Sequence, residues 1–241
     1  MTAFACTLCG KCCLNLEERD APAWPDSFDT LAPFGLYGLP TRAGLPVWSW
    51  ERGRMMDAAE RRGVPIAFVP SLVAIDREQV IVLVWELATR ACPLHVSRIA
   101  SEFPPPVRPR EDGTVVLCGA YEERPAVCRA YPVLIRGTAA AWSAKCPDAF
   151  APDAADRAGF AATYTDSFAA AEVAARIPAV VRDVLRFLET TRDLALVRGL
   201  DRDAALDRVR KGPVVDLVDR LSRGGPFSPA DLAARVAAVG G

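Results

Sequence analysis

The first 150 residues alternate short apolar runs with turn-forming residues, a pattern typical of strands and hairpins. Two β-branched runs at 66–75 and 79–85 flank a charged tripeptide and predict a β-hairpin. A smaller hairpin is predicted over 133–142, and residues 51–63 have the spacing of a short helix with a solvated arginine face. Residues 14–50 are rich in Pro, Gly and Trp without a clear period, which indicates an ordered but irregular segment.

Beyond residue 151 the sequence becomes rich in Ala, Arg, Leu and Val, with apolar positions three and four residues apart. This spacing is typical of amphipathic helices. A first helix is predicted to begin at Ile177-Pro178 and to carry an apolar stripe towards Val197. We therefore expect an α+β chain with two regions, 1–150 with short hairpins and 151–241 with helices.

Three more helical segments are predicted near the C-terminus. Asp201 is placed to cap a helix that Gly212-Pro213 then ends, and residues 214–221 are interpreted as a further helical turn or two. Ser228-Pro229 has the order of an N-cap followed by a proline in the first turn, so a last helix is predicted from there to about Val239. The C-terminal region is thus predicted to be a small all-helical part.

Composition and charge exclude several classes of protein. The chain has 241 residues, of which 51% are hydrophobic and 24% charged, so it can bury a core without metal or disulfides. Lys and Arg number 29 against 30 Asp and Glu, so the basic excess of nucleic-acid-binding proteins is missing. Apolar runs fall short of the roughly 20 residues of a bilayer span, and the N-terminus does not resemble a signal peptide. We expect a cytoplasmic protein with no nucleic-acid or membrane partner.

The cysteine content is the unusual feature. Eight cysteines accompany a single histidine, and all of them lie in the first of the two regions. Because the cytosol keeps thiols reduced, ligation of a metal or cluster explains them better than a disulfide framework. The predicted ligands are Cys6, Cys9, Cys12, Cys13, Cys92, Cys118, Cys128 and Cys146.

The N-terminal C-x2-C-x2-C run at 6–12 has a spacing that suits metal ligation. Each C-x2-C pair lets two sulfurs converge while the intervening backbone turns its N–H groups towards them, and Gly10 offers a position free of a Cβ clash. The same spacing is found in the first three ligands of bacterial ferredoxins. A fourth ligand of that kind would be remote here, at Cys92-Pro93 or Cys146-Pro147.

The adjacent cysteines Cys12 and Cys13 are difficult to place in one site. Neighbouring side chains in extended backbone point in opposite directions, so we expect the two to serve different centres, or one of them not to be a ligand. Eight thiolates divide into two four-sulfur sites, either two tetrahedral zinc ions or two iron–sulfur clusters. One cluster with some free thiols is the other arrangement.

A second motif, C-x2-Y-x2-R-P-x2-C-R-x-Y-P, runs from Cys118 to Pro132. Together with the N-terminal run, Cys92-Pro93-Leu94 and Cys146, it resembles the YkgJ-like cysteine-cluster family, described as zinc- or iron-chelating CxxCxxCC domains. The resemblance covers residues 4–148 and departs from the family pattern at Ala120, where isoleucine is usual. It implies that the eight cysteines form one metal-binding constellation, and that residues 1–150 form an irregular, metal-stapled domain.

Buried thiolates require hydrogen-bond donors and positive charge nearby. Lys11, Arg124 and Arg129 are close to the cysteines in sequence, and we expect their N–H groups to bond to the sulfurs. Tyr121 is expected to pack beside them and offer its hydroxyl group. His95 is expected to be a surface or hydrogen-bonded histidine, because eight sulfurs already suffice as ligands.

We therefore predict a cytoplasmic metal-binding protein that holds an iron–sulfur cluster, with [4Fe–4S] favoured, or zinc, in a redox or metal-handling role. One alternative is an iron–sulfur-dependent enzyme, methyltransferase-like or an oxidoreductase, because some flagellin lysine N-methylases carry a similar cysteine motif. The sequence shows no P-loop or G-x-G-x-x-G fingerprint to support it. The other alternative is a structural-zinc module whose C-terminal helices bind a protein partner.

Overall fold

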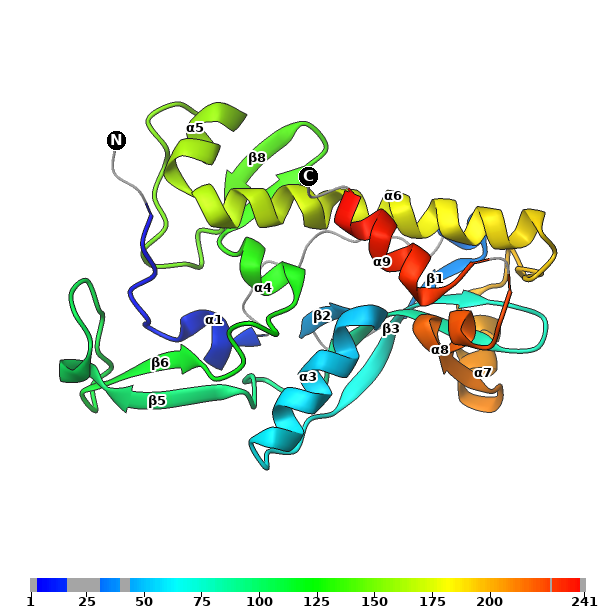
Figure 1. Ribbon diagram of the computed structural model, residues 1–241, viewed down its shortest axis with the longest axis horizontal. Coiled ribbons are helices and arrows are strands. Elements are labelled where there is room, and N and C mark those ends of the chain that lie inside the picture. The colour runs from blue at the N-terminus through cyan, green and yellow to red at the C-terminus, as the bar shows by residue number, and fades with distance from the viewer. Residues whose placement is uncertain (1–3, 17–30, 40–43, 226, 239–241) are drawn as a thin grey trace.

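The computed structural model describes residues 4–16, 31–39, 44–225 and 227–238 (Figure 1). In this part of the chain the fold is α+β, as predicted, with a five-stranded sheet and two separate two-stranded ribbons. Figure 1 shows an elongated molecule with the five-stranded sheet at one end and the β5–β6 and β7–β8 ribbons at the other. The long helix α6 (Thr165–Thr190) runs between the two ends.

The five-stranded sheet has the order β1-β3-β4-β2, and β9 joins it by pairing with β4. The strands β3 and β4 form the predicted hairpin and are buried over most of their length. The bounds of the five strands are β1 Leu36–Gly38, β2 Leu45–Trp48, β3 Phe68–Ile75, β4 Val80–Leu87 and β9 Val214–Asp216. The strands β1 and β2 fall in the segment predicted to be irregular, of which 17–30 and 40–43 lie outside the described residues.

Helices cover both faces of this sheet, which explains why its central strands are apolar on both sides. On one face Ile81 and Leu83 of β4 pack against Val181 of α6, in a core that also includes α8 (Leu217–Ser222) and α9 (Pro229–Ala238). On the other face Val82 packs with Ala205 of α7 (Arg202–Lys211). The two predicted regions therefore share one core, and a boundary near residue 151 stays a prediction.

The predicted start of the first C-terminal helix is wrong. The helix α6 begins at Thr165, and Pro178 lies inside it rather than at its first turn. Burial of Ile177 and Val181 in the sheet core on either side of Pro178 keeps the helix continuous although proline removes one backbone hydrogen bond. Val197 lies beyond the end of α6, and its N–H donates to the carbonyl of Ile75 at 2.8 Å instead of continuing the helix.

The remaining C-terminal predictions are confirmed except at one strand. The Asp201 side chain accepts the N–H of Ala204 at 2.7 Å and caps α7, and α9 follows Ser228 as expected. The predicted helix at 214–221 is wrong in its first half, because β9 pairs in parallel with residues 80–82 of β4. β2 pairs only with the other half of β4, so a β-branched segment can extend the sheet there. The C-terminal region is accordingly not all-helical.

Short elements build the other end of the molecule. The hairpin β7–β8 has its predicted position, α3 matches the predicted helix at 51–63, and α5 was not predicted. The bounds are α1 Lys11–Leu14, η2 Ala32–Phe34, α3 Ser49–Arg61, β5 His95–Ile99, η3 Ala100–Glu102, β6 Thr114–Cys118, α4 Ala126–Ala130, β7 Val133–Arg136, β8 Ala139–Trp142 and α5 Arg157–Thr163. Among the described residues, no helix combines the length and the apolar character needed to cross a bilayer.

Candidate metal centre

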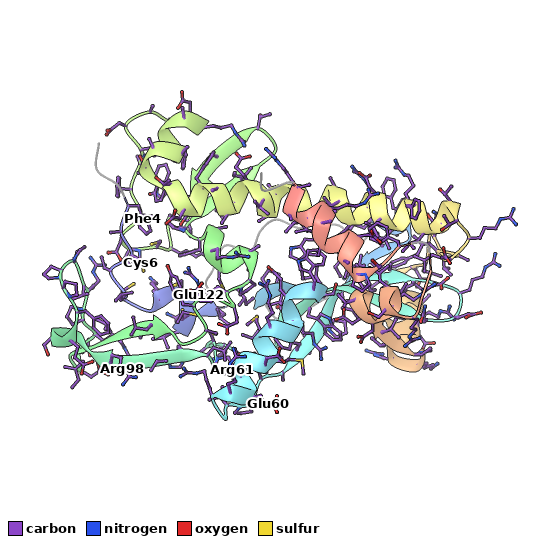
Figure 2. All side chains as sticks on the ribbon, viewed as in Figure 1. Phe4, Cys6, Glu60, Arg61, Arg98 and Glu122 are labelled. Carbon is purple, nitrogen blue, oxygen red and sulfur yellow. The ribbon has the colours of Figure 1, made fainter. Side chains whose placement is uncertain are left out.

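All eight cysteines line the same cavity, whose volume is about 640 Å³. They come from segments far apart in the sequence: the N-terminal segment and α1, the turn after β4, the end of β6, α4 and the turn after β8. Figure 2 shows Phe4 and Cys6 on the N-terminal segment, between α5 and α6 on one side and the β5–β6 ribbon on the other. No disulfide links the described cysteines.

The N-terminal C-x2-C pair has the turned backbone that its spacing predicts. Burial raises the pKa of Cys6, and a hydrogen bond from the backbone N–H of Leu8 opposes that shift. Burial likewise raises the pKa of Cys9, opposed by the backbone N–H of Lys11. In both cases the donor lies two residues after the cysteine, so the chain curls around each sulfur and directs an N–H group at it.

Gly10 makes this tight turn possible. Its φ is +74°, and an added Cβ would lie 2.4 Å from the Cβ of Val116 on β6. The same turn is fastened to β6 by a hydrogen bond from the Val116 N–H to the Leu8 carbonyl, at 2.9 Å. The predicted need for glycine is therefore confirmed, and its reason includes contact with a second strand that the sequence did not reveal.

Two remote cysteines repeat this arrangement. Burial raises the pKa of Cys118, and the backbone N–H of Ala120 opposes the shift. Burial raises the pKa of Cys146 to about 11, opposed by the N–H groups of Asp148 and Ala149. Four of the cysteines thus accept a backbone N–H from the residue two positions on. Hydrogen bonds of this kind stabilise a ligating thiolate.

The vicinal cysteines do not have the geometry assumed from extended backbone. Cys12 and Cys13 lie in the short helix α1, where successive side chains diverge less than in a strand, and their Sγ atoms are 3.9 Å apart. The pKa of Cys13 is raised, first by its contact with the Cys12 thiol, then by burial and by Cys128 and Cys92. The division of the pair between two centres stays a prediction.

Electrostatic neighbours sort the sulfurs into two groups. The charge of Asp148 raises the pKa of each member of the Asp148 group, which is Cys6, Cys9 and Cys146. The Cys128 group is Cys13, Cys92, Cys118 and Cys128, because Cys128 raises the pKa of both Cys13 and Cys118 and Cys92 raises that of Cys13. Cys12 borders both groups, since it influences the pKa of Cys6 and of Cys118.

The sulfurs share a cavity without meeting at a point. Within the described ranges of the chain, no three His, Cys, Asp or Glu side chains are arranged so that they could hold a metal ion as they stand. Ligation therefore requires the short segments that carry the cysteines to draw together around the ion, as happens in sites whose metal binding is coupled to folding.

Sequence reasoning missed Asp148 as a member of this site. Its carboxylate accepts a hydrogen bond from the Thr7 hydroxyl group and lies 3.5 Å from the guanidinium of Arg108. The Arg108 N–H in turn donates to the Thr7 carbonyl at 2.8 Å. An acid two residues after Cys146 is visible in the sequence, but nothing there shows that it returns to the N-terminal segment.

The predicted donors Lys11, Tyr121, Arg124 and Arg129 all line the cavity. The charge of Arg124 opposes the burial-driven rise in the pKa of Cys118. Tyr121 is 60% exposed, and its ring lies 3.6 Å from the Arg124 guanidinium carbon, so it acts as a platform for that cation at the rim. His95 is hydrogen-bonded as predicted, with Nδ1 2.6 Å from the Cys92 carbonyl oxygen.

Comparisons of the chain with protein-family models, with curated proteins and with solved structures give no match. The resemblance to the YkgJ-like family therefore rests on the cysteine motifs.

Proposed function

We propose that this chain is a metal-binding protein whose cavity holds iron, as an iron–sulfur cluster, or zinc. One observation carries the proposal: every cysteine, from the first at Cys6 to the last at Cys146, lines the same cavity. Cysteines scattered as ordinary core residues have no reason to collect in one place. Thiolate ligands select zinc and iron–sulfur clusters over calcium or magnesium.

Two sites of four sulfurs fit the grouping best. The Asp148 group together with Cys12 supplies one set, and the Cys128 group supplies the other. The 3.9 Å separation of the Cys12 and Cys13 sulfurs would then place the two sites on adjacent sides of α1. Lys11 on the same helix and Arg129 beside Cys128 supply positive charge against the excess negative charge of the thiolates.

The cavity has room for an iron–sulfur cluster as well as for zinc. A zinc ion requires sulfurs about 2.3 Å away and no further space. A cavity of about 640 Å³ is much larger than that requirement, and a cluster with inorganic sulfide occupies more of it. The [4Fe–4S] form is the assignment that the ferredoxin-like spacing at 6–12 supports.

Anaerobic purification followed by elemental and sulfide analysis tests this function. We expect iron with sulfide, or zinc, at one or more ions per chain, and for a cluster a broad absorption at about 400 nm. Cys9→Ser and Cys92→Ser sample the two groups, and each variant should lose about half of the metal while keeping the rest. A colourless protein with less than one metal ion per chain contradicts the proposal, and loss of all metal in both variants contradicts two separate sites.

The cavity also favours a second candidate, an enzyme that uses the cluster. Its volume lies within the range of about 300–1,000 Å³ found for small-molecule pockets, and its walls combine Met55 and Tyr164 with charged Arg129. Calorimetry of the metal-loaded protein with S-adenosylmethionine tests the methyltransferase form of this candidate. Saturable binding of S-adenosylmethionine would support a methyltransferase, and absence of binding heat would contradict it.

A further inference from the structure

Glu51 is a buried carboxylate whose role the metal site does not explain by itself. It lies in the first turn of α3 and is only 2% exposed. Both oxygens accept backbone N–H groups: Oε2 that of Trp48 at 3.2 Å, and Oε1 that of Ala126 at 2.7 Å. Burial raises its pKa, opposed by these two N–H groups and by the charges of Arg54 and Arg129.

The two hydrogen bonds have different meanings. The bond to Trp48 satisfies the N-cap N–H at the start of α3, so it acts within a few residues of Glu51 itself. The bond to Ala126 reaches 75 residues along the chain to the first residue of α4. First-turn N–H groups of a helix need an acceptor, and the N-cap residue of α4 is Pro125, whose side chain cannot supply one. Glu51 therefore caps two helices at once.

The second of these helices carries Cys128. The helix α4 spans five residues, which is too short to hold a direction through its own hydrogen bonds. Its orientation must come from contacts with its surroundings, which include its packing against α6 and β2 and the Glu51 carboxylate. The carboxylate is anchored to α3, so its bond to Ala126 sets where the Cys128 sulfur lies relative to Cys13 and Cys118.

We propose that Glu51 is a positioning residue of the Cys128 group, acting through the first turn of α4 and not as a ligand. This inference rests on the proposed metal-binding function. Its effect is selective, because the Asp148 group stands on the N-terminal segment and on the turn after β8, which Glu51 does not cap.

Zinc affinity, measured by competition with a chromophoric chelator, is the first test. Loss of groups that orient metal ligands typically lowers metal affinity about 10–100-fold. We expect Glu51→Leu to weaken one class of zinc sites by that factor and to leave the other class unchanged. Glu51→Gln keeps an amide oxygen for Ala126 and should recover most of the affinity. Asp76→Leu is the matched control, because Asp76 is also buried and accepts the N–H groups of Arg77 and Ala195 at the sheet end.

Cysteine reactivity in the metal-free protein is the second test. Alkylation of the metal-free protein, followed by peptide mass spectrometry, should show Cys128 reacting faster relative to Cys9 in Glu51→Leu but not in Asp76→Leu. If Glu51→Leu does not fold, Ala126→Pro removes the donor instead, at a first-turn position that tolerates proline and follows an extended residue. Unchanged zinc affinity and an unchanged alkylation ratio overturn the inference. A wild-type chain that binds no zinc and no iron overturns the proposed function, while the alkylation ratio still decides the role of Glu51.

Discussion

The sheet end and the cavity end of the molecule are held together by different means. At the sheet end, β3 and β4 have eight residues each, and Ile81, Val82 and Leu83 are completely buried. At the cavity end, α1 has four residues, α4 has five, and the ribbons are two-stranded (Figure 1). Short elements bury little apolar surface each, and the buried clusters around Leu94 and Phe160 are smaller than the main sheet core, so packing contributes less to their arrangement.

The difference indicates where the metal would contribute to folding. Backbone turns at the cavity end direct N–H groups at sulfurs rather than at other strands, as at Cys6 and Cys118. Such turns are stabilised when the sulfur is a ligating thiolate. The sheet end contains the largest hydrophobic cluster among the described residues, whereas the clusters of the cavity end are smaller. Metal loss should therefore affect the two ends unequally.

Removal of the metal by a strong chelator should have the largest effect. Structural zinc contributes on the order of 10 kcal/mol in small domains that depend on it. Hydrogen exchange of the stripped protein should show lost protection in α1, β6 and α4, while β3, β4 and the second half of α6, which packs on the sheet, remain protected. Equal loss of protection at both ends would show that the two ends are not stabilised separately.

Shortening a buried side chain of the sheet core should destabilise the sheet end without affecting metal binding. Leu83→Ala removes a completely buried side chain between β4 and α6, and should lower the free energy of unfolding by about 2–5 kcal/mol. Chemical denaturation measures the change. Metal content per folded chain should stay the same as in the wild type, and a proportional loss of metal would contradict the separation of the two ends.

Adding a methyl group at Gly10 should destabilise the cavity end and lower its metal content. Gly10→Ala places a Cβ in a left-handed residue and 2.4 Å from Val116, which together cost about 2–4 kcal/mol. Gly137→Ala is the control, because φ is +60° there and an added Cβ meets no described atom within 4 Å. Both variants share the backbone strain, so a loss of metal in Gly10→Ala alone identifies the contact between the N-terminal turn and β6. Equal metal content in the two variants would show that this contact is not needed for metal binding.

The smallest effect is expected at α9, which belongs to the sheet end. Hydrogen bonds from the backbone N–H and hydroxyl group of Ser228 lower the pKa of Asp231. The folded state therefore favours the carboxylate. Its stabilising contribution is present above the ordinary pKa of aspartate and is lost as the pH falls through the lowered value. Amide exchange in α9 of the wild type should therefore rise as the pH falls through the lowered pKa of Asp231. Asp231→Asn should show no such rise. A rise in both proteins would show that another group causes it.

Local patterns predicted much of the fold. The hairpins β3–β4 and β7–β8 and the helices α3, α7 and α9 follow from strand periodicity, turn residues and caps, which act between near neighbours in sequence. The strand β9 and the early start of α6 could not be predicted in this way. Each depends on a surface offered by another element: the open edge of β4 for β9, and α4 and β7 for the first half of α6.

In the candidate site, too, local features could be predicted from the sequence and long-range contacts could not. Spacing predicted the curled backbone at Cys6 and Cys9 and the need for Gly10, because these are properties of a few consecutive residues. The roles of Asp148 and Glu51 depend on residues far away in sequence, and a single carboxylate in a chain carries no pattern that reports its partner.

X-ray absorption at the metal edge, on protein purified anaerobically, tests the central claim most directly, because it reports the atoms bound to the metal. If the cavity cysteines hold the ion, the first shell should consist of sulfur at about 2.3 Å. A first shell of oxygen or nitrogen, or a metal signal that survives in Cys9→Ser and Cys92→Ser without change, would contradict it.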